Sequence, residues 1–177
     1  VKGYWLDPAA TAAAVRAGWL YTGDLGALDA DGFLTITGRK KELLVMSNGK
    51  KVVPSYLEGL LQSDPCIDQV LVCGEGRNFL TALLVPHWGN VRQALQAEGL
   101  ACDPDPRDGA APAVTALLER RVRAALADVS GAEQVRKFIV VPEPFSVAAD
   151  EMTVSLKLRR GVVLDRYAAR LDELYRE

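Results

Sequence analysis

The sequence has few of the residues on which disulfide frameworks, zinc sites and histidine-based triads depend. Its 177 residues include 3 cysteines and 1 histidine. The cysteines, Cys66, Cys73 and Cys102, are odd in number and lack C-x-x-C spacing, which argues against a disulfide framework or a zinc site and fits a reducing compartment. The single histidine, His87, leaves little room for a triad, and its place after Pro86 favours a structural role.

The sequence also lacks an excess of positive charge and a long apolar run. It has 21 basic and 23 acidic side chains, and the net charge of -2 excludes a strongly basic nucleic-acid-binding protein. No apolar run reaches the roughly 18–20 residues that a membrane-spanning helix needs, so we expect no transmembrane segment. The chain begins at Val1, without an initiator methionine or the apolar core of a signal peptide, and we expect it to be part of a longer protein.

The rest of the composition is typical of a globular protein, with 49% hydrophobic and 25% charged residues. Apolar periodicity, with prolines and glycines as boundaries, predicts both helices and strands. The predicted helices span residues 8–17, 54–62, 88–100, about 114–129 and about 160 onward, and the predicted strands span 24–28, 33–37, 70–73, 80–85 and 138–141. This mixture predicts an α+β fold.

The character of the chain changes near Gly38 to Lys41. Residues 1–40 hold a short helix and a hairpin, which are too few to bury a core of their own. Residues 41–177 mix strands and helices in the way of a complete small α+β domain. We therefore expect 1–40 to be the tail end of a preceding domain and 41–177 to be a separate domain.

Two familiar ligand motifs begin in this sequence but are incomplete. Gly49-Lys50 resembles the end of a phosphate-binding P-loop, but position 44 is Leu where that loop requires Gly. Asp29-Ala30-Asp31 resembles a calcium loop, but position 40 is Lys where a bidentate Glu is required. Turns explain both segments better, and we expect no metal site in this chain.

A set of segments in a particular order is more informative than any single motif. In chain order they are Gly18-Trp19-Leu20-Tyr21-Thr22-Gly23-Asp24-Leu25, Asp29-x-Asp31-Gly32-Phe33, Gly38-Arg39-Lys40-Lys41-Glu42-Leu43, Ser47-Asn48-Gly49-Lys50-Lys51-Val52-Val53-Pro54 and Ser155-Leu156-Lys157-Leu158-Arg159-Arg160. Together they resemble the C-terminal part of the AMP-forming acyl-CoA synthetases of the adenylate-forming superfamily. The residues of several segments are similar to those of the long-chain fatty-acid–CoA ligase branch.

The resemblance implies a fold and a reaction. The fold is a small, mobile C-terminal lid domain with a short, mostly antiparallel sheet flanked by helices. It begins at residue 41, after a β-hairpin remnant of the large N-terminal adenylation domain in residues 1–40. In the reaction, a carboxylate attacks ATP to give acyl-AMP, and the thiol of CoA then forms the thioester. The resemblance implies that the small domain rotates about a hinge between these steps.

Three residues near the domain boundary match functional positions of the family. Asp24 matches an aspartate that accepts hydrogen bonds from the two ribose hydroxyls, and Arg39 matches an arginine beside the ribose and phosphate. Lys41 matches the hinge residue, where a large backbone change is concentrated. The alternatives are an Asp24 carboxylate that bonds backbone N–H groups of a turn, and two solvated surface cations.

Two further residues match positions that serve the separate half-reactions. Lys157 matches the catalytic lysine that orients the carboxylate and stabilises charge during adenylation. Because Val154 stands where the family usually has Pro, we expect the loop that carries Lys157 to be looser. Gly49 matches the turn that lines the pantetheine path, where glycine permits close approach of backbone. The alternatives are an ordinary surface lysine and a glycine that only closes a hairpin.

The resemblance also implies the partners. They are the N-terminal adenylation domain of the same protein and, as substrates, a fatty acid, ATP and CoA, with AMP as a product. Mg²⁺ is expected in the parent enzyme but is not expected to be ligated by this chain. We expect a cytoplasmic protein, with peripheral membrane association through the missing domain left open, and a fragment that is inactive alone.

Two other functions stay open. A related fatty acyl-AMP ligase would stop at the adenylate or pass it to a carrier protein, so that the product, acyl-CoA or acyl-carrier, separates the two. A non-enzymatic small α+β binding module is the second alternative. A reading frame with no adenylation domain upstream of Val1 would favour it.

Overall fold

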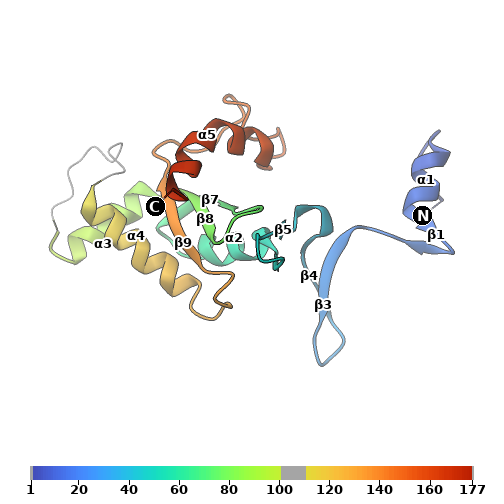
Figure 1. The fold of residues 1–177 in the computed structure, drawn as a ribbon, viewed down its shortest axis with the longest axis horizontal. Helices are drawn as coiled ribbons and strands as arrows, with labels where there is room; N and C mark the ends of the chain where they lie inside the picture. The colour runs from blue at the N-terminus through green and yellow to red at the C-terminus, as the bar shows by residue number, and fades with distance from the viewer. Residues whose placement is uncertain (1, 101–110, 177) are drawn as a thin grey trace. The chain divides into compact units, whose positions relative to one another are not determined.

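The computed structural model describes residues 2–100 and 111–176 (Figure 1). Cys102 and most of the proline-rich segment after it lie outside the described residues. The chain divides into two compact units, Val1–Leu43 and Leu44–Glu177. Helices and short strands occur together, which confirms the predicted α+β class. Among the described helices, none combines the length and the apolar content needed to cross a bilayer.

The first unit consists of one short helix and short strand pairs (Figure 1). Its elements are α1 (Pro8–Ala14), β1 (Val15–Arg16), β2 (Trp19–Leu20), β3 (Asp24–Leu28), β4 (Leu34–Arg39) and the 3₁₀ turn η1 (Lys40–Glu42). β3 and β4 pair in antiparallel register. At the tip of this hairpin, Asp29 Oδ1 accepts the Phe33 N–H at 2.8 Å, and Gly32 takes a left-handed φ of 85°. The predicted hairpin is therefore confirmed.

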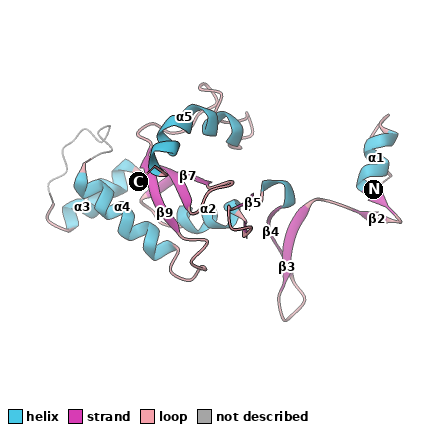
Figure 2. Ribbon diagram, viewed as in Figure 1, coloured by secondary structure: helices cyan, strands magenta, loops and turns pink. Residues whose placement is uncertain are grey.

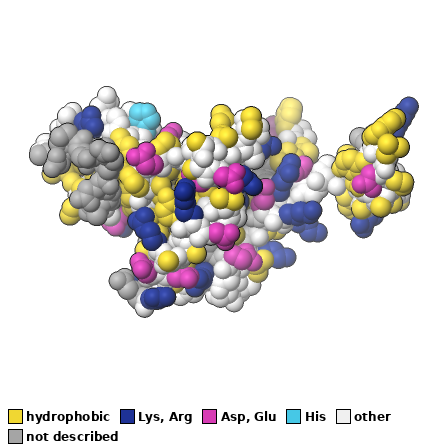
Figure 3. Space-filling view, turned by 90° about the horizontal axis from the view of Figure 1, so that it is seen from above, with side chains coloured by type: hydrophobic (Ala, Val, Ile, Leu, Met, Phe, Trp, Pro, Cys, Tyr) yellow, Lys and Arg dark blue, Asp and Glu magenta, His cyan; other side chains and the backbone are white. Residues whose placement is uncertain are grey.

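The first unit has no core of its own. None of residues 2–43 is buried, as the composition of this stretch predicts. Its large apolar side chains are instead exposed: Tyr4, Trp5, Leu6, Trp19, Leu20, Tyr21, Leu28, Phe33, Leu34 and Ile36. Figure 3 shows apolar side chains covering the surface of α1 and the β1–β2 pair. Such a dense apolar surface is typical of a segment that another domain covers.

The second unit is a layered α+β domain (Figure 2). Its elements are β5 (Leu44–Val45), β6 (Lys51–Val52), α2 (Pro54–Gln62), β7 (Ile67–Cys73), β8 (Leu80–Pro86), α3 (Trp88–Ala97), α4 (Pro112–Ala125), β9 (Val135–Val140) and α5 (Arg160–Leu174). Prolines begin α2 and α4 because the first helical position needs no N–H donor. The predicted helices of this unit are present, with α3 and α4 shorter at their C-termini than predicted.

The central sheet of this unit has three strands in the order β7-β8-β9. β8 pairs with β7 antiparallel and with β9 parallel. The other strand pairs in the described chain are antiparallel, which agrees with the mostly antiparallel arrangement expected. Every residue of β8 is buried, because this strand lies between two neighbours and both of its faces are covered.

Alternation along β7 sends successive side chains into two different cores. Val70 and Val72 belong to a cluster that also contains buried residues of α2, α3 and α4. Leu71 and Cys73 belong to a second cluster with Val163 and Leu171 of α5. Figure 1 shows α5 on one face of the sheet and the remaining helices of this unit on the other. The sheet is thus covered on both sides, and α5 begins directly after the segment that carries Lys157.

Candidate functional site

Asp24 and Arg39 face each other across the β3–β4 hairpin. They are ladder partners, and Arg39 Nε lies 3.3 Å from Asp24 Oδ1. The Arg39 side chain is 66% exposed and the Asp24 side chain 29%. The carboxylate therefore pairs with a guanidinium rather than with the backbone N–H groups of the turn. The pair leaves Asp24 Oδ2 and most of the guanidinium available to a ligand with hydroxyl and anionic groups.

Lys41 lies in the 3₁₀ turn η1, directly after β4. Its side chain is exposed, and the division between the two compact units follows at residue 43. A short 3₁₀ turn is held by weaker hydrogen bonds than an α-helix. The geometry is therefore compatible with a backbone change at this point. The hinge role itself stays a prediction.

Gly49 closes the turn between β5 and β6. It has a left-handed φ of 79°, and no atom lies within 4 Å of the place that a Cβ would occupy. The Gly49 N–H donates to the Met46 carbonyl at 2.8 Å, and the Met46 N–H donates to the Lys50 carbonyl at 2.9 Å. The turn therefore requires glycine for its backbone and leaves open space beside it.

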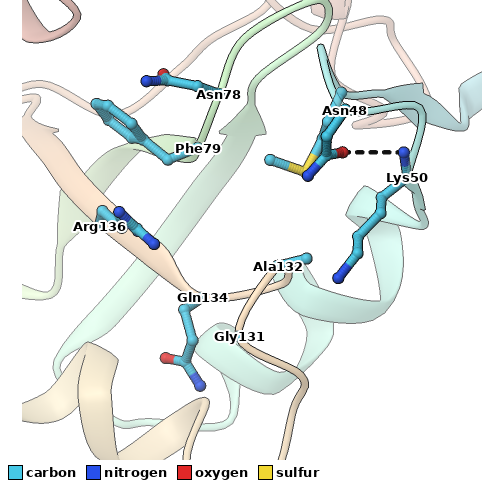
Figure 4. A pocket seen from close by; sticks show the side chains of 9 residues that line it. Asn48, Lys50, Asn78, Phe79, Gly131, Ala132, Gln134 and Arg136 are labelled. Carbon is cyan, nitrogen blue, oxygen red and sulfur yellow. Dashed lines mark hydrogen bonds between the residues drawn. The ribbon is translucent and has the colours of Figure 1, made fainter.

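A pocket of about 190 Å³ adjoins this turn (Figure 4). It is lined by Met46, Asn48, Lys50, Asn78, Phe79, Gly131, Ala132, Gln134 and Arg136. These residues come from the β5–β6 turn, the β7–β8 connection, the connection between α4 and β9, and the start of β9. The Lys50 N–H donates to Asn48 Oδ1 at 3.0 Å, which fixes the shape of the turn at the pocket wall.

The pocket carries positive charge and no carboxylate. Lys50 and Arg136 lie on opposite sides of it in Figure 4, and none of its lining residues is acidic. The Arg136 guanidinium also stacks near the ring of Phe79, with 6.0 Å between Cζ and the ring centroid. Such a cavity suits an anionic group next to a flat or thin polar chain. Sequence reasoning missed Arg136, although the basic pair Arg136-Lys137 before the predicted strand at 138–141 was a usable signal.

Lys157 lies in an exposed turn between the Met152–Leu158 bridge residues, just before α5. The Thr153 N–H donates to the Lys157 carbonyl at 2.8 Å, and the Lys157 N–H donates to Thr153 Oγ1 at 3.1 Å. The expectation that this loop is looser than in relatives with a proline stays a prediction. Side-chain and backbone bonds from Thr153 hold the turn in place of a proline. Within the part of the chain that the structure describes, the Lys157 ammonium has no ion-pair or hydrogen-bond partner.

The helix that follows Lys157 is tied to the body of the domain by Arg160. Arg160 donates to Glu58 Oε1 and to the Val72 carbonyl, each at 2.5 Å. Glu58 Oε1 also accepts the Val72 N–H at 2.8 Å. We call these three residues the Glu58–Arg160 brace. No local pattern predicts it, because Glu58 and Arg160 are 102 residues apart in sequence.

A second carboxylate, that of Glu151, also bonds to α5. Glu151 is 4% exposed and pairs with Arg166 of α5, while its backbone carbonyl accepts the Arg159 N–H at 2.8 Å. The ion pair with Glu151 raises the pKa of Arg166, so the arginine stays charged. The turn that carries Lys157 is therefore exposed, while the residues around it are anchored.

The cysteines of the described chain are structural. Cys66 and Cys73 are buried and free of disulfides. Burial raises the pKa of the Cys73 thiol to about 12. At neutral pH this thiol is protonated and is not a nucleophile. His87 is also structural, since its Nδ1 accepts the Asn90 N–H at the start of α3.

The structure thus brings Asp24 and Arg39 together, and it places Gly49 beside a cationic pocket. A second pocket, largely apolar, lies between β7 and α5. Lys157 lines neither of the two pockets. Across residues 2–100 and 111–176, no group of three or more His, Cys, Asp or Glu side chains could hold a metal ion.

Comparison with known proteins gives consistent matches. The model of a family described as the AMP-binding enzyme C-terminal domain matches residues 41–177. The long-chain-fatty-acid–CoA ligase FadD15 of Mycobacterium tuberculosis is 39% identical over 183 residues, which cover 98% of this chain and 29% of that protein. The chain thus spans less than a third of the length of this relative.

Two solved structures extend the likeness to the fold. The adenylation domain of a carboxylate reductase from Mycobacterium chelonae superposes with a TM-score of 0.77 at 26% identity, covering 99% of this chain and 26% of that one. A didomain of the carboxylic acid reductase from Segniliparus rugosus, solved in complex with AMP, gives a TM-score of 0.76 at 29% identity. That match covers 98% of this chain and 23% of the reductase chain.

Proposed function

Since the chain belongs to the family of AMP-binding enzyme C-terminal domains, we propose that it is the C-terminal lid of an ATP-dependent long-chain fatty-acid–CoA ligase. The observation that carries the proposal is the 39% identity to FadD15 over 98% of this chain. The exposed apolar surface of residues 2–43 fits a preceding adenylation domain that would cover it.

The reaction proposed has two half-reactions. In the first, an oxygen of the fatty-acid carboxylate forms a bond to the α-phosphorus of ATP, and the bond from that phosphorus to pyrophosphate breaks. In the second, the CoA sulfur forms a bond to the acyl carbon, the bond from that carbon to the AMP oxygen breaks, and the thiol proton passes to solvent. The lid would present a different face in each step.

We assign nucleotide binding to Asp24 and Arg39. The adjacent oxygens of a carboxylate suit the two hydroxyls of a ribose, and the guanidinium suits ribose and phosphate oxygens. The 3.3 Å contact between their side chains supports a joint role, since one ligand could contact both. The solved relative in complex with AMP makes AMP a reasonable ligand for this pair.

We assign the first half-reaction to Lys157. Its ammonium can attract the carboxylate and an α-phosphate oxygen at once, which orients the nucleophile and stabilises the charge that develops in the transition state. The lysine acts as a cation throughout and transfers no proton. Its exposure and its lack of an ion-pair partner among the described residues support this assignment, because no internal carboxylate competes with the substrate.

We assign the second half-reaction to the face around Gly49. The open space beside Gly49 suits the thin pantetheine arm of CoA, and Lys50 and Arg136 in the neighbouring pocket suit its phosphates. Lys41 would be the hinge that exchanges this face for the Lys157 face. The rotation is an inference from the family and from the position of Lys41 at the boundary of the two units.

The proposal is tested by measuring the half-reactions separately in the full-length protein that contains this chain. Lys157→Ala should lower adenylation by on the order of a hundred-fold or more, because a preorganised charge at the reacting centre is lost. Thioester formation from supplied acyl-AMP should survive. Arg123→Gln, which removes a positive charge from the exposed side of α4, is the control and should leave both steps unchanged.

The outcomes separate the alternatives. Equal losses in both half-reactions would contradict the role of Lys157. An acyl-AMP that forms but never yields acyl-CoA would favour a fatty acyl-AMP ligase. An unchanged adenylation rate in Lys157→Ala would also contradict the role of Lys157. A parent gene with no adenylation domain would favour a binding module.

A further inference from the structure

The turn that carries Lys157 is organised by a single threonine. The Thr153 carbonyl accepts the Leu156 N–H at 2.8 Å, and the Thr153 N–H donates to the Lys157 carbonyl at 2.8 Å. Its hydroxyl oxygen accepts the Lys157 N–H at 3.1 Å and shares a hydrogen bond of 3.0 Å with Ser155 Oγ. Both backbone polar groups of Lys157 therefore bond to the same residue.

This turn has no other support at its tip. Residues 153–157 are all exposed, so no apolar packing holds them. Only the flanking Met152 and Leu158 pack against the core cluster under α5. Leu156 adopts a left-handed φ of 60°, a conformation that residues with a Cβ disfavour. An exposed segment with an unfavourable backbone conformation stays ordered only if local bonds outweigh the conformational entropy that it loses.

We propose that Thr153 is a positioning residue for adenylation: its hydroxyl holds the Lys157 backbone so that the ammonium points in one direction from the turn. The inference rests on the role proposed above for Lys157. In this proposal Thr153 contacts neither the fatty acid nor ATP, and it acts only through Lys157. The hydroxyl is the part of Thr153 that a substitution can remove without changing the shape of the side chain.

The chain offers a matched series of variants. Thr153→Val is nearly isosteric and removes the hydroxyl, whereas Thr153→Ser keeps it. Thr115→Val makes the same chemical change on α4, outside the Lys157 turn. Thr153 is exposed, and at the half-buried Thr115 valine has nearly the same shape, so none of these changes opens a cavity in a core.

The first readout is hydrogen exchange at the Lys157 amide in the 177-residue chain. Thr153→Val should lose protection at this amide by on the order of ten-fold, since its acceptor is gone. Thr153→Ser should keep most of it, and Thr115→Val should not change it. An unaltered Lys157 amide in Thr153→Val would overturn the inference without any reference to catalysis.

The second readout is the pair of half-reactions in the full-length protein. Thr153→Val should lower the kcat of adenylation by on the order of ten-fold with little change in KM, because a displaced catalytic group costs rate more than binding. Thioester formation from supplied acyl-AMP should be unchanged, and Thr153→Ser should recover adenylation to within about two-fold of the parent. Equal losses in both steps, or a serine variant as slow as the valine variant, would refute the positioning role.

Lys157→Ala, measured alongside, separates this inference from the proposed function. If Lys157→Ala loses adenylation while Thr153→Val keeps it, only the positioning role fails. If Lys157→Ala keeps adenylation, the proposed role of the lysine fails, and the positioning role fails with it.

Discussion

The Glu58–Arg160 brace should contribute more to stability than a surface ion pair of the same composition. Glu58→Gln keeps the shape of the side chain and removes its charge. The side chains of Arg160 and Glu58 are 24% and 15% exposed, so solvent screens this pair only in part. The variant therefore isolates the contribution of the charge within a half-buried network.

The expected magnitude follows from the bonds that Glu58 Oε1 accepts. One comes from the Val72 N–H at 2.8 Å and one from Arg160 at 2.5 Å. A hydrogen bond to a charged group is worth about 1 kcal/mol more than a neutral one. Loss of the charge should therefore lower the free energy of unfolding by about 2 kcal/mol, which corresponds to a fall in Tm of roughly 4–8 °C for a domain of this size.

The matched control is Glu98→Gln. Glu98 accepts two 2.7 Å hydrogen bonds from Arg120, but these side chains are 41% and 53% exposed. An exposed pair contributes less than about 1 kcal/mol and is weakened by salt. Urea unfolding followed by circular dichroism, at low and high salt, compares the two variants. Equal effects of the two substitutions would refute the argument that partial burial makes the brace stronger.

Three further predictions concern the hinge, the thiol and the turn. Lys41→Pro, which restricts φ, should damage one half-reaction and spare the other, and an unchanged enzyme would count against the hinge. The Cys73 pKa is raised by burial from 9.0 to about 12, so the thiol's contribution to stability is complete below the unfolded value and is lost as pH rises toward 12. Denaturation at several pH values should therefore show stability falling by up to about 1.4 kcal/mol per pH unit above 9, with a shallower fall in Cys73→Ala. Leu156 has a left-handed φ of 60°, so Leu156→Gly should preserve adenylation. Leu156→Val should reduce adenylation, because a β-branched residue rarely adopts this conformation. Equal adenylation rates in these two variants would show that the backbone conformation of the turn is unimportant.

The sequence predicted those parts of the fold that depend on local patterns. Prolines and apolar spacing were sufficient to predict α2 and α4, and the Asp29–Gly32 turn was sufficient to predict the β3–β4 hairpin. The parallel pairing of β9 with β8 was not predicted, because it joins segments separated by two helices. Strand pairing of this kind is decided by packing in three dimensions rather than by neighbours in sequence.

The candidate site shows the same limit. Asp24, Arg39, Gly49 and Lys157 could be named from motifs, but what holds the Lys157 turn could not. The absence of a proline at 154 could be read from the sequence, but the hydrogen bonds of the Thr153 hydroxyl with Lys157 and Ser155 could be found only in the structure. The part played by Arg136 in the cationic pocket likewise depends on how β9 lies against the β5–β6 turn.

Between residues 2 and 45 the structure buries no side chain, and this has a practical consequence for work on the protein. Within the part of the chain that the structure describes, a truncation that begins at Leu44 would keep every buried side chain while it discards the exposed Trp5, Trp19 and Tyr21. Such a shortened chain should aggregate less than the 177-residue chain, because it exposes fewer large apolar side chains. It would retain the turns at Gly49 and Lys157, so each could be titrated with its ligand in isolation.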